Sequence, residues 1–144
     1  MGSEDRYNLE RFVQAQQGSF DQACAELRRG RKTRHWMWFI FPQFAGLGLS
    51  ETSRKYAIAS IEEAQAYLAH PVLGPRLREV CRLVSLLKGQ SMSEVFGYPD
   101  DLKLRSSMTL FAHATTENAL FVGIIRDFFG GEFDGLTLEL MGLS

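Results

Sequence analysis

The residue types most suited to ligand chemistry are concentrated in one stretch of the chain, residues 28–50. Five arginine and lysine residues at its start are followed by His35 and then by Trp36 to Pro42, an almost wholly apolar run that contains both tryptophans. A cation can neutralise a phosphate, an indole ring can stack on a flat ligand, and an amide or an unpaired backbone N–H can donate hydrogen bonds. We therefore predict a site for a phosphorylated or nucleotide-like small molecule, with these ligand-binding residues: Arg34, His35, Trp36, Trp38, Gln43 and Ser50.

A glycine-rich turn favours this interpretation. Gly46 and Gly48 let the backbone approach a ligand closely, and Ser50 is placed to cap a helix whose first N–H groups would face an anion. The turn has neither the third glycine of a dinucleotide-binding fingerprint nor the Gly-Lys-Ser/Thr of a phosphate loop. The site is thus predicted from the combination of residue types and not from a known motif.

A second polar cluster lies between Asp101 and His113. Lys103, Ser106 and Ser107 suit a second wall of the same site, because hydroxyl groups beside cations can hold polar ligand atoms. Hydroxyls within a helix can instead bond back to the preceding turn. A nucleophilic serine needs a base and an orienting group, and the chain has no Gly-x-Ser-x-Gly elbow. No catalytic residue can be assigned, and whether the protein is an enzyme stays open.

Other roles are compatible with the same residues. Cations beside aromatic rings resemble a groove for single-stranded nucleic acid, but the formal net charge is −1 and the chain outside residues 28–34 carries −6, so we expect no more than weak, unspecific binding of nucleic acid. An exposed aromatic patch would suit a protein-interaction module. The arginines and lysines could also be a solvated helix end, and the tryptophans could belong to the core.

Composition places the chain among ordinary globular proteins. With 144 residues, 45% hydrophobic and 23% charged, it is expected to form one domain over residues 1–144, residues 1–5 being either left over from expression or disordered. No apolar run is long enough to span a membrane, and the amino terminus lacks the apolar segment of a signal peptide, so a cytoplasmic location is expected. The oligomeric state is not predicted.

The cysteines and histidines indicate no metal site, and nothing in the chain indicates a cofactor. Cys24 and Cys81 are far apart, and each lies among helix-patterned apolar residues, which favours two buried thiols over a disulfide or a metal pair. The three histidines have no paired spacing with each other or with the cysteines. We expect His70, which precedes a proline, to fix a helix end by hydrogen bonding.

Helical periodicity and capping residues account for most of the chain. Apolar residues recur at intervals of three and four, and glycine or proline ends most of the expected helices. Further helices are expected from Pro75 to Gly89 and over residues 91–96. Polar residues with capping side chains stand at the other expected helix starts. These expected caps are Asn8, Ser19, Ser50, Ser60, Asp100, Thr116 and Asp134.

Residues 36–41 could form either a buried strand or a buried helical turn, because a short all-apolar run fits both. Pro42 pushes the residue before it out of the helical region, so the element ends there in either case. Residues 102–105 alternate like a strand, although a helix is preferred. Seven or eight helical segments with at most one or two short strands predict a mainly α fold, a compact single-domain multi-helix bundle.

Three motifs in the chain resemble a known family. They are Lys32-Thr33 with residues 35–43, residues 70–74 (His-Pro-Val-Leu-Gly) and residues 106–111 (Ser-Ser-Met-Thr-Leu-Phe). Together they resemble an uncharacterised bacterial domain of unknown function, DUF1810, sometimes labelled calpastatin-like, and the resemblance covers nearly the whole chain. It implies a small, mainly helical single-domain protein and supplies no established activity. Nothing in the chain reads as a disordered protease-inhibitor repeat.

A second likeness concerns the later part of the chain. The pattern Met108, Phe111, Asn118 and Leu120, with the helix pair before it, is similar to helical domains that act on ADP-ribosyl groups attached to nucleobases. The catalytic residues of those domains have no counterparts that can be placed on this sequence. What the likeness implies is an activity in ADP-ribosyl or nucleotide processing.

Overall fold

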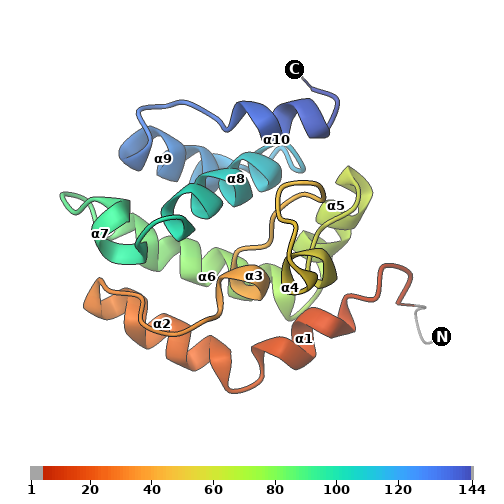
Figure 1. Cartoon of the computed structure of the whole chain (residues 1–144), viewed down its shortest axis with the longest axis horizontal. Helices are drawn as coiled ribbons and strands as arrows, with labels where there is room; N and C mark the ends of the chain where they lie inside the picture. The colour runs from red at the N-terminus through yellow and green to blue at the C-terminus, as the bar shows by residue number, and fades with distance from the viewer. Residues whose placement is uncertain (1–4, 144) are drawn as a thin grey trace.

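The expected helical segments form ten α-helices in the part of the chain that the computed structural model describes, residues 5–143 (Figure 1). Within these residues there is no β-sheet, and strand-like pairing is limited to one isolated parallel bridge between Phe44 and Ile58. The predicted mainly α, compact bundle is therefore confirmed. The helices are α1 (Glu10–Gln16), α2 (Ser19–Arg29), α3 (Met37–Ile40), α4 (Glu51–Lys55), α5 (Ile61–Ala69), α6 (Leu73–Ser85), α7 (Met92–Phe96), α8 (Asp100–Ala112), α9 (Ala119–Phe128) and α10 (Gly135–Leu140).

Helices α6 and α8 lie at the centre of the bundle. Helix α6 packs against α2, α5 and α9, while α8 packs against α5, α7, α9 and α10. Figure 1 shows α6 between α2 on one side and α8 and α9 on the other. The apolar stripe predicted for the segment from Pro75 to Gly89 is buried in this core: Leu77, Val80, Cys81, Val84 and Leu87. The bundle is thus built by burying helix faces that the sequence pattern already marks.

Three of the predicted helix caps are confirmed. The side chains of Ser50, Ser60 and Asp134 accept hydrogen bonds from the backbone N–H three residues later, at 3.1, 3.1 and 3.0 Å. At the other end of α5, Nδ1 of His70 accepts hydrogen bonds from the N–H groups of Val72 and Leu73, as expected for a residue that fixes a helix end. These side chains satisfy donors that the first turns of α4, α5, α6 and α10 would otherwise leave unpaired.

The predicted cap at Asn8 is wrong. Leu9 is the N-cap of α1, and Asn8 before it has a positive φ of 52°. The Asp5 carboxylate takes over the capping role, because it accepts hydrogen bonds from the N–H groups of Leu9 and Glu10 at 2.7 and 2.8 Å. A carboxylate several residues upstream can do this when the intervening chain turns back on itself.

Three further caps are also wrong, by one or two residues. Ser19 and Asp100 are the first residues within α2 and α8, and α9 begins at Ala119, three residues after Thr116. The N-caps are Gly18, Pro99 and Asn118, and none of them makes a side-chain cap hydrogen bond. For Asp100 the reason is visible in the packing, because its carboxylate pairs with lysine side chains instead.

The structure decides between strand and helix for the run that contains the tryptophans. Residues 37–40 form α3, a single helical turn, and Pro42 follows it closely. A helical turn places successive side chains about 100° apart, so Trp36 and Trp38 do not share a face. Trp36 is 1% exposed in the core, whereas Trp38 is partly exposed.

Both cysteines are free and buried, as predicted. Burial raises the pKa of the Cys24 and Cys81 thiols, so neither is primed as a thiolate. Among residues 5–143 no helix has the length and apolarity needed to cross a membrane. Residues 1–4, on which most of the expectation for the amino terminus rests, lie outside the described residues.

Candidate functional site

Glu26, on the last turns of α2, organises the basic stretch that follows it. Its carboxylate is fully buried and accepts hydrogen bonds from the N–H groups of Thr33 and Arg34 at 2.7 and 3.0 Å, from the Trp36 indole at 3.0 Å, and from the Arg34 guanidinium at 3.1 Å. Burial alone would raise the pKa of this carboxyl, but the four hydrogen bonds outweigh it and lower the pKa to about 2. Glu26 therefore holds the chain after α2 against the core as a carboxylate.

Part of the basic run is used in this internal structure. Lys32, whose side chain is 8% exposed, pairs with Asp100 at 2.8 Å and donates a hydrogen bond to the Arg34 carbonyl at 2.7 Å. Its ammonium also lies 5.1 Å from the centroid of the Trp36 ring. Arg34 is paired with Glu26, although its side chain is 59% exposed. Two of the five cations thus connect α2 to α8 and to the core.

The second tryptophan lies in a different environment. Trp38, on α3, has the Lys103 ammonium of α8 5.6 Å from its ring centroid, and the His35 ring lies 6.5 Å away at an interplanar angle of 32°. Lys103 also pairs with Asp100, at 3.5 Å. The fold therefore brings an accessible π face, an imidazole and an ammonium group together from two segments about 65 residues apart in the sequence. We call Trp38, His35 and Lys103 the Trp38 face.

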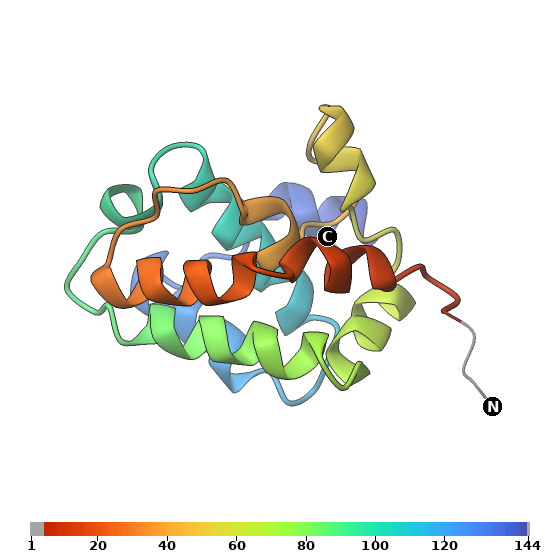
Figure 2. The same ribbon diagram turned by 90° about the horizontal axis from the view of Figure 1, so that it is seen from below.

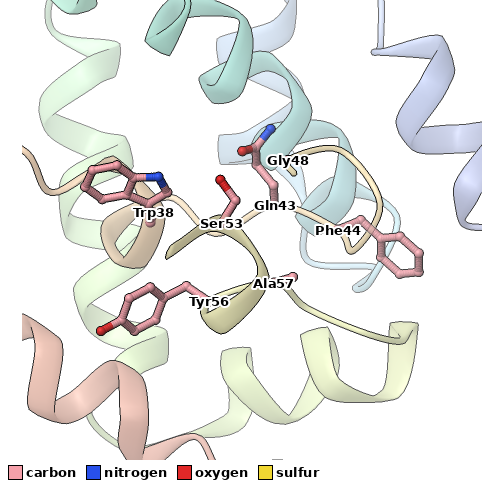
Figure 3. Close-up of a pocket in the computed structure, with 7 residues that line it drawn as sticks. All are labelled: Trp38, Gln43, Phe44, Gly48, Ser53, Tyr56 and Ala57. Atoms are coloured by element: carbon pink, nitrogen blue, oxygen red, sulfur yellow. The ribbon is translucent and has the colours of Figure 1, made fainter. Parts of the chain in front are cut away.

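A small notch adjoins the Trp38 face (Figure 3). Its volume of about 10 Å³ is room for one water molecule. In Figure 3 the Ser53 hydroxyl lies between Trp38 and Gln43, while the Phe44 ring points away from Trp38. Ser50 supports this wall indirectly, because its hydroxyl caps α4 and lies 2.8 Å from the hydroxyl of Ser53. The residues that line the notch are Trp38, Gln43, Phe44, Gly48, Ser53, Tyr56 and Ala57.

The two serines of α8 have separate surroundings. The Ser106 hydroxyl bonds to the Leu102 carbonyl at 3.1 Å and to the Asp134 carboxylate at 3.3 Å, so it joins α8 to the start of α10. The Ser107 hydroxyl is fully buried and has no hydrogen-bond partner among the described residues. Ser107 follows Lys103 by one helical turn and shares its side of α8. Neither serine lines the notch.

Larger clefts exist in a region for which the sequence pattern predicts no site. One of about 430 Å³ lies between α6 and the start of α9, and one of about 290 Å³ lies beside it; Arg78 and Glu117 line both. The Arg78 guanidinium donates a hydrogen bond to the Glu117 carbonyl at 3.2 Å and lies 5.2 Å from the Phe121 ring centroid. The sequence signal for this region is slight, because Arg78 and Arg82 read as the solvated side of an amphipathic helix.

Some predicted site residues are brought together and others are separated. His35, Trp38, Gln43 and Lys103 lie at the Trp38 face and its notch, and Ser50 lies behind the notch. Arg34 and Trp36 belong to the Glu26 network, and Ser106 belongs to the contact with α10. Ser53 and Tyr56, which the sequence analysis did not single out, line the notch. Among residues 5–143 no three histidine, cysteine, aspartate or glutamate side chains are grouped as a metal site would require.

Comparisons with known proteins agree with the family resemblance. A family described as "Protein of unknown function (DUF1810)" matches residues 6–141. The chain is similar to the crystal structure of the conserved hypothetical protein Rv1873 from Mycobacterium tuberculosis, with 51% identity, a TM-score of 0.95, and coverage of 97% of this chain and 100% of that one. A search of curated proteins returned no match. The match over almost the entire length shows that the chain belongs to the DUF1810 family.

Proposed function

We propose that the Trp38 face binds a phosphorylated or nucleotide-like small molecule. The observation that carries this proposal is the Lys103 ammonium 5.6 Å from the ring centroid of a partly exposed tryptophan. Exposed indole surface is favourable for stacking a base or another flat ring, and an ammonium beside it is placed to attract a phosphate. A cation and a π face together select ligands that have both a ring and an anionic group.

Neighbouring groups add polar contacts. The Gln43 amide can donate and accept, and the Ser53 hydroxyl can do both, so a ligand that reaches the notch would find partners for ribose or base atoms. Lys103 is held by Asp100 only at 3.5 Å, so its ammonium retains donors for a ligand. Arg34 and Trp36, which the sequence predicts as ligand-binding residues, are not ligand contacts in this proposal. Both side chains already donate hydrogen bonds to the Glu26 carboxylate.

A polyanion such as nucleic acid is not part of the proposal. Lys32 is buried against Asp100, and Arg34 is paired with Glu26, which leaves Arg28, Arg29 and Arg31 as the exposed cations of the basic run without an ion pair among the described residues. Three cations at one helix end can neutralise few phosphates, so we expect only weak binding to a nucleic-acid backbone. We assign no reaction to the site, because among the described residues the Ser53 hydroxyl, which lines the notch, bonds to Ser50 and to no general base.

Thermal shift over a panel of nucleotides, nucleosides, ADP-ribose derivatives and sugar phosphates tests the proposal. A ligand at one hundred times its dissociation constant stabilises the fold by about 2.7 kcal/mol, which is a readily measured shift. Trp38→Ala and Lys103→Ala should remove the shift. Arg29→Ala, which deletes an exposed cation elsewhere, should keep it and serves as the matched control.

Two results would contradict the proposal. One is a panel in which no compound shifts the wild-type protein. The other is a shift that survives both Trp38→Ala and Lys103→Ala, since the ligand would then bind elsewhere, with the cleft at Arg78 as the first place to look.

A further inference from the structure

The notch at Trp38 is covered by an excursion of the chain that leaves the bundle and returns to it. Residues 46–56, which include α4, lie between two backbone hydrogen bonds that join the ends of the excursion: Ala45 N–H to the Ile58 carbonyl at 2.8 Å, and Ile58 N–H to the Gln43 carbonyl at 2.9 Å. Figure 2 shows α4 at the edge of the molecule, extending away from the other helices. A compact loop of this length with its ends together has the form of an Ω-loop.

Little holds the tip of this excursion to the bundle. Helix α4 is the one helix of the described chain with no buried residue. Within residues 5–143, the hydrogen bonds of residues 46–54 reach no farther than Ala57, whose N–H bonds to the Arg54 carbonyl at 3.4 Å, and no ion pair joins these residues to the bundle. One apolar contact is evident, where Leu140 of α10 packs on Gly46. Segments with so few buried contacts open at low free-energy cost compared with the core.

The base of the excursion is anchored much more firmly. The Arg11 guanidinium donates hydrogen bonds to the carbonyls of Lys55 and Ala57 at 2.7 and 2.9 Å. The Tyr56 ring packs near Phe12 and Phe39, with centroids 5.8 and 5.4 Å apart. A firm base and a weakly held tip are the parts of a hinged element. The cap of α4 by Ser50 lies within the tip, so the helix can move as one body.

We propose that residues 46–54 form a lid that opens to admit a ligand to the Trp38 face and closes over it. The inference rests on the proposed function, because it concerns the same site. The notch has room for about one water, whereas small-molecule sites are typically several hundred Å³, so one wall must move for a ligand to enter. Trp38 stands on α3, whose neighbours Met37, Phe39 and Ile40 are buried, while Ser53 on the opposite wall belongs to α4. The lid is therefore the wall that moves.

Gly48 provides a way to open the lid by mutation. A Cβ atom added at Gly48 would lie 2.4 Å from Cβ and 2.5 Å from Oγ of Ser53, and the next nearest atom is at 3.8 Å. Gly48→Ala should therefore push Ser53, and α4 with it, away from the Gly48 backbone and displace the Ser53 wall of the notch. Removing the obstructing atoms with Ser53→Gly in the same chain should let the lid close again. Ser53→Gly alone is the control for the loss of the serine.

Two measurements without ligand report the lid. In the wild type, amides of residues 50–56 should exchange with solvent about 100-fold faster than those of α6. Acrylamide quenching of tryptophan fluorescence reports on Trp38, because Trp36 is buried. Both exchange and quenching should rise in Gly48→Ala and return towards the level of the Ser53→Gly control in the double variant. Exchange as slow as that of α6, or a Gly48→Ala variant that leaves quenching unchanged, would overturn the lid.

A third measurement separates the lid from the proposed function. Adenosine 5′-monophosphate at millimolar concentration should slow exchange over residues 50–56 in the wild type and should do so less in Gly48→Ala. If the lid opens as described but neither this nucleotide nor any other compound of the panel protects residues 50–56 or shifts the melting temperature, the mobile segment is supported and the proposed function is contradicted. Protection elsewhere, without protection of residues 50–56, would overturn the role of the lid in admitting the ligand.

Discussion

Trp36 and Trp38 are two residues apart in the sequence and serve different purposes in the structure. Trp36 is 1% exposed, donates its indole N–H to Glu26, and packs its ring against Phe41 and Phe96. Trp38 is partly exposed, has Lys103 beside its ring, and borders the notch under α4. Two positions along a helical turn lie about 200° apart, which is enough to direct one ring inward and the other outward.

The difference shows how one chemically rich stretch is divided between stability and recognition. Around Trp36 each charged group has a close partner, since Glu26 accepts four hydrogen bonds and Lys32 pairs with Asp100. Around Trp38 the polar groups are more weakly held, and Lys103 has Asp100 at 3.5 Å. Groups that are already satisfied by the fold have little left to offer a ligand, whereas weakly held groups do. The Trp38 face is the better candidate for binding on this ground.

The largest expected effect separates the two rings by stability. Trp36→Ala should lower the free energy of unfolding by about 3–5 kcal/mol, because it empties a core site and leaves Glu26 without one of its donors. Trp38→Ala should cost less than about 1.5 kcal/mol, since part of its ring already faces water. Urea unfolding of both variants measures the two values. Equal losses of unfolding free energy in the two variants would contradict the assignment of Trp36 to the core and of Trp38 to the binding face.

The next effect concerns pH and the Glu26 carboxylate. Its pKa is lowered from 4.5 to about 2 on folding, so it contributes stability that is fully present above the unfolded pKa and is lost as pH falls towards the folded pKa. The loss between pH 5 and pH 2 should be about 3 kcal/mol. Unfolding free energies measured across this range check it.

Glu26→Gln is the control for that pH dependence. Three of the four hydrogen bonds converge on one carboxylate oxygen, and an amide oxygen can accept these three. The variant should be less stable than wild type at neutral pH, because the pairing with Arg34 is lost, and its stability should fall less between pH 5 and pH 2. An unchanged pH profile would mean that other carboxylates, and not Glu26, set the acid sensitivity.

A smaller effect compares the two lysines that share Asp100. Lys32, with 8% of its side chain exposed, pairs at 2.8 Å, while Lys103, with 26% exposed, pairs at 3.5 Å. Lys32→Ala should cost about 2 kcal/mol and Lys103→Ala less than about 1 kcal/mol, because the buried loss leaves a carboxylate poorly compensated. Thermal unfolding at equal salt measures the difference. A larger loss of stability for Lys103→Ala than for Lys32→Ala would show that Lys103 mainly stabilises the fold, and it would weaken the case for a ligand-binding role at the Trp38 face.

Most of the helices could be predicted from the sequence, because their signals are local. Ser50, Ser60 and Asp134 each cap a helix through a contact only three residues long. The caps that were predicted wrongly, such as Asn8 and Asp100, show that contacts with distant residues can override a local capping signal. The Asp100 carboxylate pairs with Lys32, which lies 68 positions earlier, and so does not cap α8. Asp5 caps α1 in place of Asn8 because the chain before α1 turns back on itself.

The candidate site was predictable in part. His35, Trp38 and Gln43 stand close together in the sequence, so their proximity follows from chain length alone. Glu26 was not singled out, because a glutamate on an amphipathic helix is normally exposed. The lid was not predictable either, since nothing local distinguishes α4 from a short helix that packs on the core.

The amino-acid sequence by itself determined the helical class, the presence of most helices and the location of the chemically rich stretch, since these depend on periodicity and on contacts within a few residues. Only the tertiary structure decided which tryptophan is buried, that Lys103 of α8 lies beside Trp38, and that Lys32 and Arg34 are used inside the fold. The physical reason is that burial and charge pairing are set by side chains from distant segments, which come together only when the helices pack.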